Sequence, residues 1–251
     1  MSNVSISTNK LTIGYGATIV QRDLSFSLNT GEMVCMLGPN GCGKSTLLRT
    51  LAGLQPALSG EYKLIANSQE PTAKDIALVL TERMSLDNTT VHDVVALGRY
   101  PYSSFLDGLK KEDEVMIAKS LEQVGFEQST IDYTRSTFFN AHSDGEKQRI
   151  LIAKALAQQT PIILLDEPTA HLDLLHRILI LRLLRTLAHE QNKTILISTH
   201  ELDLALALSD RILLMTPGKG IQLDTAANLK KANAFTSAFG MDIFNPGASF
   251  R

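Results

Sequence analysis

The sequence has few of the features that mark secreted, membrane-spanning or disulfide-stabilised proteins. It contains two cysteines, Cys35 and Cys42, and no tryptophan in 251 residues. Two thiols are too few for a disulfide framework, so we expect a reducing compartment. No uncharged stretch approaches the ~18–20 residues that cross a bilayer, and residues 1–10 lack the apolar segment of a signal peptide. The sequence therefore predicts a soluble globular protein.

A large excess of charge of either sign is also missing. The chain has 24 basic and 26 acidic side chains, a formal net charge of −2, and no run of lysine and arginine. Sequence-independent nucleic-acid binding requires a basic surface, and electrostatic membrane attachment requires a basic cluster. We therefore expect no nucleic-acid partner and no polybasic membrane anchor.

The chain does have enough apolar residues for a sizeable core, since 44% of its residues are apolar and 20% are charged. Strand-like and helix-like segments alternate, which predicts an α/β fold with a mainly parallel central sheet. Short apolar runs predict buried strands at residues 33–37, 76–80, 162–165, 195–198 and 212–215. Helices are predicted at residues 91–97, 111–124 and 172–189, with Gly125 ending the second of them.

No linker-like segment divides the chain, so residues 1–251 are predicted to form a single domain. Helical patterns dominate residues 85–145, and a further helix is expected to start directly after them. We interpret residues 85–158 as a helical subdomain inserted into the α/β core. Residues 216–251 form a short tail for which the sequence predicts no fold.

A glycine-rich segment follows the apolar run at residues 33–37 and precedes a helical one. It consists of Gly38, Pro39, Asn40, Gly41, Cys42, Gly43, Lys44, Ser45 and Thr46. This is the P-loop pattern, in which backbone N–H groups and a helix N-terminus bind phosphates. Lys44 can reach the β- and γ-phosphates, and the Ser45 hydroxyl can bind Mg²⁺. A ligand-free glycine turn is the alternative, but nine matching residues favour a nucleoside-triphosphate site.

An acidic pair ends the apolar run at residues 162–165. Asp166 and Glu167 would lie at the carboxyl end of a buried strand, where ligands bind in open α/β sheets. Asp166 suits Mg²⁺ coordination, and Glu167 suits polarising the water that attacks the γ-phosphate. An acidic strand-end cap is the alternative, and the P-loop makes the catalytic interpretation the stronger one.

A third segment, residues 142–149, opens another predicted helix. Ser143 and Glu146 are spaced as a capping box, which would mark any helix start. A capped helix N-terminus with Gly145 in its first turn is also a site that attracts anions. The local sequence alone leaves both interpretations open.

Four segments in this order resemble those of the nucleotide-binding subunits of ABC transporters. They are the P-loop, the helix start at residues 144–149, the segment around the acidic pair and the Ser-Thr-His sequence ending at His200. The resemblance covers residues 11–215. It implies the P-loop nucleotide-hydrolase core of that family, with an N-terminal antiparallel β part and an inserted helical subdomain. It also implies ATP and Mg²⁺ as cofactors, and ATP hydrolysis involving Lys44, Glu167 and His200.

The resemblance further implies that two copies pair head to tail around ATP. Ser143 and Gly145 would then contact the γ-phosphate held by the other copy, and Asp173 would connect the two sites. His200 would contact the γ-phosphate, although a histidine at a strand end is also an ordinary structural residue. Tyr15 falls where the family stacks an aromatic ring on adenine, although a tyrosine there can equally serve packing alone.

The chain departs from the family at two places. His142 and Asp144 replace the usual leucine and glycine of the signature sequence. No glutamine occupies the position where the family contacts Mg²⁺ and links to the membrane subunit. Glu82 is the expected occupant of that position and a proposed Mg²⁺ ligand, with Thr81 the alternative if the alignment shifts by one.

Residues 94–102, which include Gly98 and Arg99, resemble the start of the helical subdomain in ATPases of iron-chelate, haem and cobalamin importers. An ordinary helix end is the alternative. The resemblance implies a separate membrane permease as partner, a location at the cytoplasmic face of the membrane through that permease, and an extracytoplasmic substrate-binding protein. Two other functions remain open on sequence: a soluble ABC ATPase in cofactor assembly or nucleic-acid processing, and a weakly catalytic regulatory subunit.

Overall fold

The computed structural model describes residues 4–64, 71–80, 87–102, 108–126, 131–240 and 244, with no side-chain description for residues 131–133. Within this part of the chain, three strands from residues 4–64 form an antiparallel sheet in the order β2-β1-β4. Its strands are β1 (Val4–Tyr15), β2 (Thr18–Asn29) and β4 (Ser59–Leu64). This sheet is the predicted N-terminal β part.

The second sheet in the described residues is six-stranded, in the order β5-β6-β7-β3-β8-β9. Its strands are β5 (Ile76–Val79), β6 (Ile162–Asp166), β7 (Thr194–Ser198), β3 (Met33–Leu37), β8 (Arg211–Thr216) and β9 (Gly220–Asp224). The first five run parallel, and β9 pairs antiparallel with β8. All five predicted strands are therefore present, and the α/β prediction is confirmed.

The central sheet separates two hydrophobic cores because successive strand residues point to opposite faces. On β3, Met33, Cys35 and Leu37 join the core that the helices cover. Val34 and Met36 join the other core, which lies against the antiparallel sheet and α1 (Lys44–Leu51). Burial on both faces explains why the parallel strands are continuous apolar runs in the sequence.

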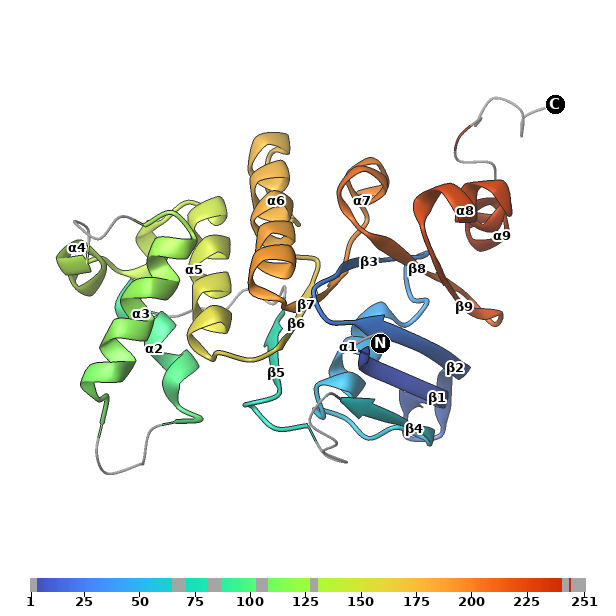
Figure 1. Cartoon of the computed structure of the whole chain (residues 1–251), viewed down its shortest axis with the longest axis horizontal. Coiled ribbons are helices and arrows are strands. Elements are labelled where there is room, and N and C mark those ends of the chain that lie inside the picture. Colours follow the sequence, from blue (N-terminus) through green and yellow to red (C-terminus); the bar gives the residue numbers. More distant parts are fainter. Residues whose placement is uncertain are drawn as a thin grey trace.

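Helices group on one side of the central sheet, at the left of Figure 1. They are α2 (Val91–Ala96), α3 (Lys111–Gln123), α4 (Ile131–Ser136) and α5 (Asp144–Ala157). The short 3₁₀ turns η1 (Leu97–Arg99) and η3 (Phe139–Ala141) connect parts of this group. α2, α3 and α5 pack against one another, which agrees with the helical insertion that the sequence predicts.

Arg99 ties three parts of this helical group together. Its Nε lies 2.8 Å from Asp113 Oδ1 on α3, and its Nη1 donates to Ala157 O and Gln159 Oε1, both at 2.7 Å. Both members of the Arg99–Asp113 pair are buried. The Arg99 side chain therefore has a structural role in holding the end of α2 against α3 and α5.

Two helices cover the sheet further along the chain: α6 (Leu174–Gln191) and α7 (Leu202–Leu208). The helix predicted at 172–189 begins two residues later because Asp173 caps it, accepting a hydrogen bond from His176 N. Among the described residues, every helix is too short or too polar to cross a membrane.

The tail after residue 215, for which the sequence predicted no fold, is ordered into sheet and helix. β9 extends the central sheet, and α8 (Ala226–Lys231) and α9 (Ala234–Phe239) follow it. Figure 1 shows these helices beside the β8–β9 edge. Leu229 and Phe235 are buried in the helix-covered core, so the tail completes that core.

Candidate nucleotide-binding site

The glycine-rich loop at residues 38–46 joins β3 to α1, as predicted. Lys44 begins α1 and is buried, and its Nζ donates to Gly38 O at 2.9 Å and Pro39 O at 3.3 Å. The Lys44 ammonium group therefore contacts the carbonyl oxygens of its own loop, beside the position where the loop would hold a phosphate. The loop lies at the carboxyl end of the parallel strands, where ligands bind in open α/β sheets.

A pocket of about 290 Å³ lies over this loop. It is lined by Tyr15, Val20, Asn40, Gly41, Gly43, Lys44, Ser45, Thr46, Glu167 and His200. The fold thus brings the glycine-rich loop together with a residue from β1, one that follows β6 and one that follows β7. Gly38, Pro39 and Cys42 belong to the same loop but do not line the pocket.

Tyr15 stands at the rim of this pocket. Its side chain is 53% exposed, and its hydroxyl lies 3.0 Å from Thr46 Oγ1. An exposed aromatic ring anchored at its polar end is suited to stacking on a planar ring system. The position is compatible with the adenine contact that the family resemblance implies.

Ser198, the last residue of β7 and not among the predicted site residues, holds the acidic pair in place. Its hydroxyl donates to Asp166 Oδ1 at 2.5 Å and accepts from the Glu167 N–H at 2.9 Å. Glu167 has a φ of 47°, in the left-handed region, which is a strained conformation for a side chain of this size. The sequence shows Ser198 only as a polar residue at the end of an apolar strand, and its place opposite Asp166 follows from the pairing of β6 with β7.

Glu167 and His200 meet at the pocket wall. His200 Nε2 lies 2.5 Å from Glu167 Oε1, and both side chains remain partly exposed. A carboxylate and an imidazole in contact at the edge of a phosphate-binding loop are suited to orienting a water and stabilising negative charge.

The structure places Ser143, Gly145 and Asp173 outside this pocket. Ser143 caps α5 as predicted: its hydroxyl accepts from Glu146 N, and Glu146 Oε2 accepts from Ser143 N at 3.0 Å and Ser143 Oγ at 2.8 Å. These hydrogen bonds, first of all from the Ser143 hydroxyl, lower the pKa of Glu146. The capping box is therefore present, and it leaves the functional interpretation of the same residues open.

Asp173 and Gly145 are joined through His176. Asp173 accepts from His176 N at 2.9 Å and lies 2.8 Å from His176 Nδ1, and these contacts, the backbone one first, lower its pKa. The other side of the imidazole lies against Gly145, where an added Cβ would stand 2.7 Å from His176 Cδ2. A side chain at this position would displace the His176 ring.

The departures from the family pattern have different structural settings. His142 is buried, packs edge-on against the Phe126 ring at 6.1 Å between centroids, and lies 3.6 Å from Glu146 Oε2. Asp144 is exposed and lies 4.0 Å from Lys147 Nζ. Thr81 and Glu82 lie outside the described residues.

The oxygen donors at this pocket fit a magnesium ion that is held largely by its nucleotide. In the described part of the chain no cluster of three or more histidine, cysteine, aspartate or glutamate side chains is arranged for a metal. Mg²⁺ typically takes one or two protein oxygens and completes its shell with waters and phosphates. Ser45 lines the pocket and can supply one oxygen. Asp166 is buried behind the pocket lining, with its Oδ1 bonded to the Ser198 hydroxyl, and would act through a water. Burial raises the pKa of the Cys42 thiol, which keeps it an unreactive packing group.

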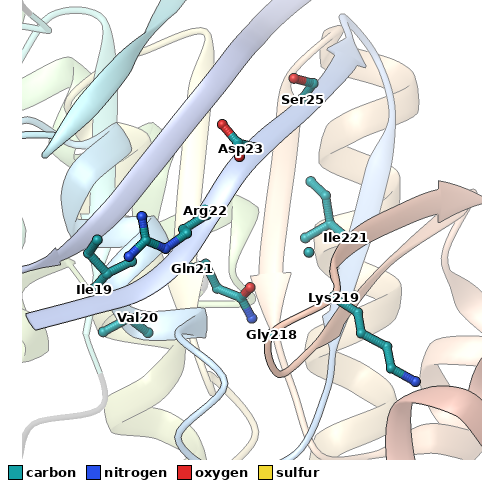
Figure 2. Close-up of a pocket in the computed structure, with 10 residues that line it drawn as sticks. Ile19, Val20, Gln21, Arg22, Asp23, Ser25, Gly218, Lys219 and Ile221 are labelled. Carbon is teal, nitrogen blue, oxygen red and sulfur yellow. The ribbon is translucent and has the colours of Figure 1, made fainter.

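A second hollow, of about 620 Å³, lies between β2 and the β8–β9 turn. Figure 2 shows its two cationic side chains, Arg22 and Lys219, extending in opposite directions. Gln21 instead points inward, toward the turn at Gly218. This arrangement gives no convergent anion site in the hollow.

Three features meet near one pocket: a phosphate-binding loop after β3, an acidic pair at the end of β6 and a histidine after β7. Together they define the class of P-loop nucleotide-binding α/β proteins. The ABC transporter family model matches residues 21–170. An ABC transporter ATP-binding protein of Methanocaldococcus jannaschii is 39% identical over 231 residues, covering 90% of this chain and 78% of that protein.

Two further comparisons point the same way. The iron(3+)-hydroxamate import ATP-binding protein of Bacillus subtilis is 36% identical over 95% of this chain and 88% of its own length. The solved structure of a metal-chelate type ABC transporter in an inward-facing conformation superposes with a TM-score of 0.82 at 30% identity, covering 95% of this chain and 90% of that one. The chain therefore belongs to the ABC transporter family, as an ATP-binding subunit with the ATPase activity of that family.

Proposed function

We propose that this chain hydrolyses ATP to drive the import of an iron chelate through a separate membrane permease. The observation that carries the ATPase part is the single pocket that joins the P-loop to Glu167 and His200. The cargo rests on relatives named for iron chelates, among them the hydroxamate importer of Bacillus subtilis and the ferric enterobactin transport protein of Escherichia coli, 34% identical over 238 residues. A ferric siderophore is the preferred cargo, followed by haem and then cobalamin.

The proposed chemistry assigns one task to each side chain at the pocket. The loop amides and Lys44 bind the phosphates, and Tyr15 stacks on adenine. Ser45 and Asp166 hold Mg²⁺, which supplies charge neutralisation on the phosphates, and Glu82 is proposed as a further ligand. Glu167 accepts a proton from the attacking water, and His200, in contact with Glu167, stabilises charge on the γ-phosphate.

The proposed partner at the nucleotide is a second copy of the chain. Asp173 and Gly145 both lie against His176, and Ser143 caps the helix that contains Gly145. These three residues do not line the pocket over their own P-loop. A capped helix N-terminus attracts anions, so this cluster is available to complete the pocket of another copy. Two identical pockets then form in a closed, two-fold symmetric dimer.

The proposed contact with the permease is the segment of residues 82–102, of which residues 87–102 are described. Tyr100 is exposed, and Tyr102 carries Arg99 and Lys74 over its ring at 4.2 and 5.2 Å. Exposed tyrosines are enriched at protein interfaces, and here the buried Arg99 supports the Tyr102 ring from below. Binding there would place the chain at the cytoplasmic face of the membrane, with a substrate-binding protein delivering cargo from the other side.

Uptake assays test the proposal. Cells with and without this chain would be supplied with labelled ferric siderophore, haem and cobalamin, and cells carrying the Glu167→Gln variant would serve as the matched control. We expect loss of ferric siderophore uptake in the cells that lack the chain and in those with the variant. Unchanged uptake of all three compounds would contradict the cargo assignment and leave the ATPase activity intact.

A further inference from the structure

Gln21 is a buried polar residue on β2, next to the nucleotide pocket. Its side chain is 2% exposed. Its Nε2 donates to Cys42 O at 3.0 Å and to Thr216 O at 3.2 Å, and Figure 2 shows the amide lying between β2 and the β8–β9 turn. One amide nitrogen thus connects β2, the glycine-rich loop and the end of β8.

The orientation of this amide follows from its partners. Both neighbours are backbone carbonyl oxygens, which only accept hydrogen bonds, so the nitrogen and not the oxygen of Gln21 must face them. Gln21 Oε1 is buried and has no hydrogen-bond partner among the described residues. A methionine of similar volume would avoid that unsatisfied acceptor, so the two donated hydrogen bonds are what glutamine adds at this position.

The hydrogen bond to Cys42 O fixes a peptide group of the P-loop. A trans peptide is planar, and its C=O and N–H point in opposite directions. Gln21 holds the Cys42 carbonyl, so the N–H of the same peptide group, that of Gly43, points away from the Gln21 amide. Gly43 itself lines the nucleotide pocket. A side chain outside the loop therefore restricts the orientation of this N–H.

Without such a hydrogen bond this peptide has freedom to rotate. Gly43 has a φ of 107°, a region that glycine enters readily and other residues rarely adopt. Val20 also restricts this position, since a Cβ on Gly43 would stand 2.7 Å from Val20 Cγ1. Val20 thus excludes a side chain at position 43. Glycine at this position makes rotation of the Cys42–Gly43 peptide easy, and the hydrogen bond from Gln21 opposes that rotation.

We propose that Gln21 is a positioning residue that pre-orients the Gly43 amide for the phosphates of the nucleotide. This inference rests on the proposed nucleotide site and adds to it a residue from outside the P-loop. P-loop amides contact the phosphates shared by ATP and ADP. Loss of the Gln21 hydrogen bond therefore weakens the binding of both nucleotides and changes the hydrolytic step much less.

The test compares Gln21→Met with Arg22→Met, a control on the same strand with an exposed side chain outside the nucleotide pocket. We expect the Kd of ATP and of ADP to rise about tenfold in Gln21→Met. This is the change expected for losing the charge-assisted hydrogen bond between the Gly43 N–H and a phosphate oxygen. We expect kcat at saturating ATP to change less than about twofold, and Arg22→Met to behave as the unmodified chain. A lower melting temperature with unchanged Kd and KM would mean that Gln21 only stabilises the fold, and would overturn the inference.

A second variant covers the case in which Gln21→Met does not fold. Gln21→Leu has a shorter side chain with no donor and no buried charge, so we expect it to fold and to weaken ATP binding by about as much as Gln21→Met. Wild-type affinity in Gln21→Leu would overturn the inference. An unmodified chain that binds no ATP would overturn the proposed nucleotide site together with it, whereas ATP binding by the unmodified chain with unchanged Kd values in both variants would overturn the inference alone.

Discussion

Glu167 combines three local features: a left-handed backbone conformation, an amide held by Ser198, and a carboxylate 2.5 Å from His200. The strained backbone is fixed by the hydrogen bond from its own amide to the Ser198 hydroxyl. Such over-determined strain is concentrated at functional sites. The carboxylate is therefore held at the pocket wall by its own backbone as well as by its neighbour.

We expect Glu167→Gln to lower ATP hydrolysis by ~10²–10⁴-fold, because an amide cannot accept the proton of the attacking water. ATP binding should be retained, since the phosphate-binding loop is unchanged. Steady-state hydrolysis and equilibrium nucleotide binding together check this. Asp203→Asn makes the same chemical change at an exposed residue outside the pocket and should have no effect. Near-wild-type turnover in Glu167→Gln would remove Glu167 from the proposed role.

Two kinds of signal identified residues at the pocket: a strong local pattern for the P-loop and the acidic pair, and the family resemblance for Tyr15 and His200. The P-loop and the acidic pair follow continuous apolar strands, so their neighbours in the sequence already indicate their place in the fold. Gln21 and Ser198 were not identified because their partners are distant in sequence: Thr216 for Gln21 and Asp166 for Ser198. A hydrogen bond between such residues depends on strand order, which no local pattern contains.

Secondary structure elements show the same division. The strands at 33–37 and 162–165 were predicted almost to the residue because both of their faces are buried. The sequence predicted an N-terminal β part without placing β1 or β2, whose polar and apolar residues alternate and whose register is interrupted by bulges near Leu11. α8 and α9 are each six residues long and owe their stability to tertiary packing, since helices this short are marginal alone.

At the contact between α5 and α6, the fit of His176 against Gly145 leads to a testable coupling. Gly145→Ala would put a methyl group 2.7 Å from His176 Cδ2. The His176 side chain is partly exposed and can move aside, so the stability cost should stay below that of core overpacking, about 1 kcal/mol or less. We expect the displaced His176–Asp173 pair to lower ATPase activity.

A double-mutant cycle distinguishes this clash from a direct effect of the methyl group on nucleotide. In a His176→Ala background the clash is removed, so Gly145→Ala should reduce ATPase activity much less than it does in the unmodified chain. Equal losses in both backgrounds would show that His176 is not the group that the methyl displaces.

The ion pair between η1 and α3 predicts a stability effect with a defined pH dependence. Asp113→Asn removes the charge beside the buried Arg99, and breaking a buried pair costs about 3–5 kcal/mol; we expect the lower end, since asparagine still accepts a hydrogen bond. Asp144→Asn changes an exposed carboxylate and should cost less than about 1 kcal/mol. Denaturant unfolding near pH 7 measures both.

The pKa of Asp113 gives the sign of the pH effect. Hydrogen bonds from Lys110 N and the Arg99 side chain lower it from its ordinary value of 3.8. The stabilisation is therefore complete above that value and is lost as the pH falls toward the lower folded-state pKa. The stability difference between the unmodified chain and Asp113→Asn should shrink below pH 3.8; a difference that stayed constant would contradict the ion-pair explanation.

At the scale of the whole molecule, two separated half-sites predict a nucleotide-dependent dimer. The P-loop pocket and the cluster of Ser143, Gly145 and Asp173 would meet only between copies. We expect Glu167→Gln with ATP and Mg²⁺ to double in mass by light scattering, because hydrolysis no longer opens the dimer. The same variant with ADP should remain monomeric. A monomer at saturating ATP would contradict the shared site.

The position of β3 within its sheet has a consequence for how the chain is made. β3 lies between β7 and β8, so both strands beside the strand that leads into the P-loop are synthesised long after it. A nascent chain that has reached only residue 170, where the family match ends, leaves both edges of β3 unpaired and prone to association with other chains. The ability to bind nucleotide therefore arises late in translation, and a premature stop before residue 216 abolishes a site whose phosphate loop was translated among the first fifty residues.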